Sequence, residues 1–183
     1  EDLDECQFAS DVDIKGLRHD YSTYGLGVPL IALRKRHEDE TPGETFYPEG
    51  LTFPVTAFLR ALPEESGEPD GHHRLLLELY DPLETHDIVV RDVRVPLETD
   101  FSTPLAVFLN KAMLERLATR GLLRPDRWQK VAGPYLMQPY QEDKIPVMFV
   151  HGLWSEPSAW SEMFNELLAD PRIRYNYQFW FYT

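Results

Sequence analysis

A strand–helix–strand pattern in the last forty residues is the feature that most constrains the fold. Ile145–Val150 is an apolar run with β-branched and aromatic side chains on both faces, which is typical of a strand buried between two layers. Apolar residues then recur with helical spacing over residues 158–169, and Tyr177–Tyr182 is a second, aromatic run. Two strands joined through a helix form the βαβ building block of a parallel sheet.

The first strand leads into His151-Gly152. Glycine permits unusual backbone dihedrals and close approach of another group, so a tight turn is expected at this point. Asp170-Pro171 is expected to end the helix, because the residue before proline disfavours the helical conformation.

The sequence I-P-V-M-F-V-H-G-L-W-S-E-P-S-A-W at residues 145–160 resembles the first central strand and oxyanion turn of bacterial α/β-hydrolases of the lipase and esterase kind. The resemblance implies that His151 and Gly152 form the turn and that the backbone N–H of Leu153 is one oxyanion donor. Trp154 would shape the substrate pocket. It also implies a small-molecule or lipid acyl substrate and no cofactor or metal.

The nucleophile elbow of that family, G-x-S-x-G, does not occur in the 183 residues. In this fold the catalytic serine, acid and histidine follow the oxyanion turn in the sequence. We therefore expect them beyond residue 183, in the remainder of the hydrolase domain, and expect these 183 residues alone to show no turnover. The alternative is a non-catalytic binding or adaptor module that carries a truncated hydrolase start.

Short strands without intervening helices dominate the upstream sequence. They are predicted at Val28–Leu33, Thr52–Leu59 and His73–Tyr80, with one or two more within Asp87–Leu97. This pattern predicts an antiparallel sandwich or small barrel, and hence an α+β protein overall. The segment also resembles the β-rich region that precedes the core in some bacterial hydrolases.

One helix is predicted in this upstream region, over residues 103–120. Thr103 is expected to cap it, Pro104 suits its first position, and Gly121 follows its last turn. A polar stretch after residue 140 suggests a boundary between a β-rich domain, residues 1–140, and the start of the hydrolase core, residues 141–183.

Charge excludes one class of partner. Eighteen Lys and Arg residues stand against 31 Asp and Glu, a net charge of −13, so nucleic acid is not an expected partner. The acidic runs are interpreted as solvated loops rather than metal sites. Membrane contact has no support in the sequence, which also contains no signal or membrane-spanning segment, and the compartment stays open.

The aromatic strand Tyr177–Tyr182 carries one more prediction. No strand follows it in the 183 residues, so it is expected to leave an unpaired edge and to promote association.

Overall fold

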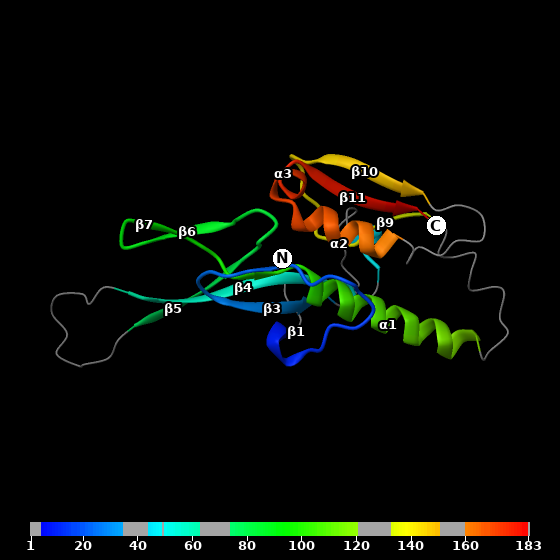
Figure 1. Ribbon diagram of the computed structural model, residues 1–183, viewed down its shortest axis with the longest axis horizontal. Coiled ribbons are helices and arrows are strands. Elements are labelled where there is room, and N and C mark those ends of the chain that lie inside the picture. The colour runs from blue at the N-terminus through cyan, green and yellow to red at the C-terminus, as the bar shows by residue number, and fades with distance from the viewer. Residues whose placement is uncertain are drawn as a thin grey trace.

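The computed structural model describes residues 5–34, 44–48, 50–62, 74–120, 133–150 and 160–182, with the side chains of 112–120 left out. The chain is an α+β protein, as predicted. Its strands form mostly antiparallel sheets, and the described helices pack between two of them (Figure 1).

The larger sheet has four antiparallel strands in the order β1-β3-β4-β5. These are β1 (Glu5–Phe8), β3 (Val28–Leu33), β4 (Thr52–Ala61) and β5 (Leu75–Tyr80). The bounds of β3 are those predicted, whereas β1 was not foreseen. In Figure 1 the far ends of β4 and β5 project away from the rest of the molecule. Two short 3₁₀ turns, Ala9–Asp11 and Glu44–Phe46, flank the sheet strands in sequence.

Two ribbons accompany this sheet. β2 (Ser22–Thr23) pairs with β8 (Thr99–Asp100), and β6 (Asp87–Val90) pairs with β7 (Val93–Pro96). Arg91 and Asp92 join β6 to β7 with φ angles of 49° and 64°, as in the two-residue turns that match strand twist. Within the described ranges, the upstream strands thus form a four-stranded sheet and two short ribbons. The hydroxyl of Thr56 on β4 donates to the carbonyl oxygen of Glu98, which immediately precedes β8, so the β2–β8 ribbon lies against this sheet. The antiparallel pairing is as predicted, and the sandwich or small barrel stays a prediction.

Helix α1 (Ser102–Arg120) begins one residue earlier than predicted. Thr103 is not its cap. Instead, the N–H of Thr103 donates to Asp100 Oδ1 at 2.8 Å, and its hydroxyl donates to the other carboxylate oxygen. Asp100 therefore satisfies a free N–H of the first turn and places negative charge at the positive end of the helix.

The downstream unit has the predicted parallel pairing. β10 (Ile145–Val150) lies parallel to β11 (Tyr177–Tyr182), and α2 (Ser161–Ala169) and α3 (Pro171–Arg174) connect them. α2 starts three residues later than the predicted helix and ends before Asp170, as expected. The carboxyl ends of β10 and β11 meet at one edge, where Val150 pairs with Tyr182.

The expectation that β11 leaves an unpaired edge is wrong. β9 (Pro134–Leu136) pairs antiparallel with Trp180–Tyr182, so β11 is the middle strand of the order β10-β11-β9. The sequence pattern missed this because β9 lies some forty residues upstream, and its pairing is not a local property. β11 therefore offers no free edge for association.

The main core joins residues from both sides of residue 140. α2 lies between the β9–β11 sheet and α1 (Figure 1), and its Phe164 contacts Phe179 and Phe181 edge to face. Phe101 and Leu105 from the start of α1 belong to the same buried cluster. A smaller cluster, around Phe53 and Val55, lies on one face of the larger sheet. The proposed domain boundary at 140 stays a prediction, but the two sides share one core.

Candidate functional site

The four residues predicted to form the oxyanion turn, His151, Gly152, Leu153 and Trp154, lie outside the described residues. The structure describes both flanks of this segment: Val150 is the last residue of β10, and Trp160 immediately precedes α2. The segment therefore connects the carboxyl end of a parallel strand to a helix. In open α/β sheets, ligands bind outside the carboxyl ends of the strands.

Aromatic stacking joins the two flanks. The ring of Phe149 stacks on Trp160 with centroids 5.4 Å apart and on Phe179 at 5.6 Å. Phe149 is buried, and the indole Nε1 of Trp160 is buried without a hydrogen-bond partner. These contacts hold the end of β10 against the start of α2, so both ends of the connecting segment have fixed positions.

A buried amide network anchors the opposite end of the same strands. Gln178 donates through Nε2 to the carbonyl oxygens of Gln141, at 2.9 Å, and Lys144, at 3.1 Å. Lys144 donates through Nζ to the carbonyl oxygen of Leu83 at 2.8 Å. Burial lowers the pKa of the Lys144 ammonium. These groups lie at the amino end of β10 and β11, away from the predicted turn, so we assign them a positioning role.

A second linkage ties α2 to the segment that precedes β2. Asn165 is fully buried and accepts a hydrogen bond from the Ser102 hydroxyl at 2.8 Å, while its Nδ2 donates to the carbonyl oxygen of His19 at 2.9 Å. Ser102 in turn accepts from the N–H of Tyr21 at 2.8 Å. Side chains of α1 and α2 thus satisfy the backbone of this irregular segment.

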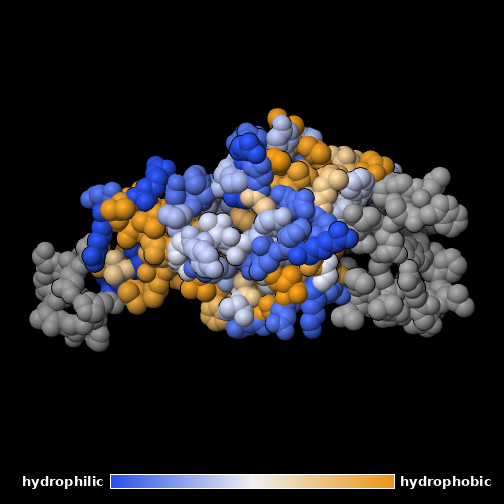
Figure 2. Space-filling model, in the orientation of Figure 1, coloured by the Kyte–Doolittle hydropathy of each residue, from blue (hydrophilic) through white to orange (hydrophobic). Residues whose placement is uncertain are grey.

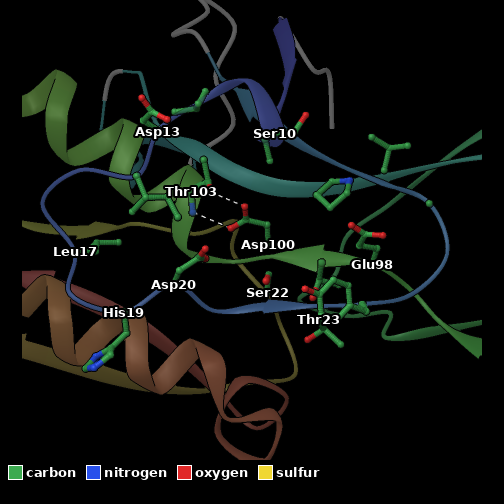
Figure 3. Close-up of a pocket in the computed structure, with 18 of the residues that line it drawn as sticks. Ser10, Asp13, Leu17, His19, Asp20, Ser22, Thr23, Glu98, Asp100 and Thr103 are labelled. Carbon is green, nitrogen blue, oxygen red and sulfur yellow. Dashed lines mark hydrogen bonds between the residues drawn. The ribbon is translucent and has the colours of Figure 1, made fainter.

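The Asn165 linkage borders an open cavity of about 760 Å³, lined by residues from 9–29 and from 98–103 (Figure 3). Four carboxylates line it, from Asp13, Asp20, Glu98 and Asp100. Burial raises the pKa of Asp20, and the negative charge of Asp100 adds to this effect.

The cavity does not assemble a catalytic triad. Ser10, Ser22 and His19 all line it, but His19 is directed toward α2 and away from both serines (Figure 3). Its Nδ1 lies 3.6 Å from a carboxylate oxygen of Glu166, and both side chains are largely exposed. Asp100 is engaged in capping α1. The residues are therefore those of an acidic cleft rather than a nucleophile–base pair.

The two segments that line this cleft are about seventy residues apart, so no local sequence pattern indicates it. The sequence contains a signal for one of its residues only: the D-x-x-T spacing at residues 100–103 is typical of an aspartate that caps a helix. No group of three potential metal-ligating side chains occurs among the described residues, and no helix in the same ranges is long and apolar enough to cross a bilayer.

Replacing Asp20 with asparagine is expected to raise the stability of the protein at pH 7 but not at pH 3. An aspartate with a raised folded-state pKa favours folding in its protonated form. Its destabilising effect is therefore absent below the unfolded-state pKa of about 3.9 and appears as the pH rises through the folded value. Urea denaturation of both proteins at the two pH values measures this. An equal difference at both would contradict the assignment.

Comparison of the chain with protein-family models, with curated protein sequences and with solved structures finds no match. Functional conclusions therefore depend on the motif and on the geometry around it.

Proposed function

We propose that the chain is the amino-terminal part of a serine hydrolase of the α/β-hydrolase family, acting on ester or other acyl bonds. The observation that carries the proposal is the parallel pairing of β10 with β11 through α2. This pairing supports a site in the His151–Trp154 segment, between a strand's carboxyl end and a helix. In α/β-hydrolases one oxyanion donor comes from a strand-to-helix loop of this kind.

The outer face of the β9–β11 sheet supports the same proposal. Met148 and Val150 of β10 and Tyr182 of β11 are apolar or aromatic and are 45–61% exposed, while Phe149, Phe179 and Phe181 fill the opposite face. Parallel sheets in α/β proteins are usually buried on both faces. An apolar outer face is what such a sheet presents before further helices cover it.

The proposed role of Leu153 follows from the chemistry of acyl transfer. Attack on a carbonyl group places negative charge on its oxygen, and an N–H aimed at that oxygen stabilises the transition state. The chain would supply this donor from its backbone, with Trp154 bordering the pocket. The proposal assigns the nucleophile, the acid and the general base to sequence that follows residue 183.

Proline at position 153 should lower kcat by about 10²–10³-fold, because proline has no N–H and one oxyanion donor is worth roughly this factor. Alanine at the same position keeps the N–H and is the matched control. The protein to use is the whole product of the reading frame that contains these residues, assayed with p-nitrophenyl esters of increasing acyl length. Thermal denaturation of both variants checks that each is folded.

Two results would reject the proposal. One is a reading frame that supplies no glycine-flanked serine, which would favour a binding or adaptor module. The other is saturable hydrolysis that Leu153→Pro and Leu153→Ala reduce equally, which would place the donor elsewhere. Replacing the Leu153 amide by an ester linkage removes the N–H without the proline ring and separates loss of the donor from local distortion.

A further inference from the structure

One face of the four-stranded sheet carries a continuous set of aliphatic side chains. Strand register places Val28 beside Ala57 and Ala57 beside Leu79, and it pairs Leu59 with Leu77. Because side chains alternate between the faces of a strand, residues two apart belong to the same face. We call this set the leucine face; its members are Val28, Ala57, Leu59, Ala61, Leu75, Leu77 and Leu79.

The leucine face is open to solvent. Its four leucines are 48–61% exposed and Val28 is 45% exposed. In Figure 2 hydrophobic surface gathers over the projecting part of the molecule, which contains the far ends of β4 and β5 and the β6–β7 ribbon. The exposed area is on the order of 500 Å², in the range of patches that mark interaction sites.

The same face is covered farther along the sheet. Phe53 and Val55 precede Ala57 on this side of β4, and both are buried in the cluster that includes Leu51, with Tyr47 packed against it. The leucine face is therefore the uncovered continuation of a core layer. Its aliphatic side chains are typical of a face that packs against a second layer of protein.

The charged side chains of the two strands lie on the opposite face. Arg60 donates from Nε to Glu78 at 2.9 Å, and Tyr80 donates to the same carboxylate at 2.8 Å. Arg60 also donates to the carbonyl oxygen of Val89 in the β6–β7 ribbon at 3.1 Å. The leucine face itself contains no charged residue. Two copies that met through these seven residues would therefore bring no charged side chain of the leucine face into contact.

The two rows of the leucine face differ in side-chain size. Along β4 the residues alternate small and large, as Ala57, Leu59 and Ala61, whereas the β5 row is leucine throughout. Across a two-fold axis, the leucine row of one copy can lie over the alanine positions of the other, and the reverse. Two-fold contacts use the same patch on both copies and require this property.

We propose that the leucine face packs against the leucine face of a second copy of this chain, forming a two-layer β-sandwich across a two-fold axis. Together the two copies would bury about 1,000 Å², the lower bound for a specific interface, so the dimer is expected to be reversible. The proposal is independent of the hydrolase assignment.

The test compares two threonine substitutions on neighbouring residues of β5. Leu77 lies on the leucine face and is 61% exposed, while Leu76 lies on the opposite face and is 44% exposed. Threonine favours strands, so neither change should unfold the sheet. Analytical ultracentrifugation should show that the wild type forms a dimer. Leu77→Thr should raise the Kd of this dimer at least about tenfold, because each copy loses a leucine that the interface buries. Leu76→Thr should leave Kd within about twofold of the wild type.

All measurements are made under reducing conditions, because Cys6 is an exposed thiol and its oxidation would cross-link copies. A wild type that stays monomeric at 100 µM overturns the proposal. Equal effects of Leu76→Thr and Leu77→Thr on the Kd would also overturn it, because they would indicate that two copies pair through the edges of β5. Flotation of a monomeric wild type with phosphatidylcholine vesicles would assign the face to lipid and likewise reject a second copy.

Discussion

Replacing Phe164 with alanine is expected to lower the free energy of unfolding by about 3–5 kcal/mol, the usual cost of removing a buried aromatic ring. Phe164 is 1% exposed, and its ring meets Phe179 and Phe181 edge to face with centroids 5.6 and 5.3 Å apart. It projects from α2 into the cluster shared with α1. Alanine would leave a cavity between α2 and the β10–β11 pair. Urea denaturation at 25 °C measures the resulting loss in the free energy of unfolding.

Met163 provides the matched control for Phe164. It precedes Phe164 on α2 but is 43% exposed, so Met163→Ala should cost less than about 1 kcal/mol. If Phe164→Ala leaves too little folded protein to measure, Phe164→Leu should give a smaller loss that is still larger than that of the control. Equal losses at 163 and 164 would mean that α2 does not pack as described.

The strongly apolar strands were predictable from sequence. The predicted bounds of β3, β10 and β11 match the structure, because each is a largely apolar or aromatic run. Short elements depend on tertiary pairing instead. β1 reads Glu-Cys-Gln-Phe and alternates polar with apolar residues, but four exposed residues are too few for this alternation to identify a strand without its partner β3.

The start of helix α3 was not predicted, although Asp170-Pro171 indicates it. Asp170-Pro171 does end α2, but it also starts a new turn, with Asp170 accepting from the N–H of Arg172 at 2.9 Å and Pro171 in the first position. Aspartate before proline is a common helix start as well as a stop. Local sequence alone did not distinguish the two.

The face that a strand presents was predictable, but its covering layer was not. Alternation along β5 places Leu75, Leu77 and Leu79 on one side, yet all three are exposed. Likewise, the His151-Gly152 motif indicated a site from a continuous stretch of sequence, whereas the acidic cleft around Asp20 is built from two distant segments. Periodicity describes one element at a time, and both missed features depend on how elements meet.

The second large effect is expected at Asn165, whose replacement by leucine should cost about 2–4 kcal/mol. Asn165 is fully buried, and the substitution leaves the Ser102 hydroxyl and the His19 carbonyl group without their partner. Each unsatisfied buried polar group costs about 1–3 kcal/mol. Glu166→Ala is the control on the next residue, since its contact with His19 is exposed and should contribute less than about 1 kcal/mol.

A double-mutant cycle with Ser102 tests whether the Asn165 linkage is direct. Ser102→Ala and Asn165→Leu each remove the same 2.8 Å hydrogen bond, so their combined cost should fall below the sum of the single costs by about 1–2 kcal/mol. Strictly additive costs would contradict a direct bond. Because Ser102 starts α1 and Asn165 lies on α2, coupling between them would show that this hydrogen bond links the two sides of residue 140 in the folded protein.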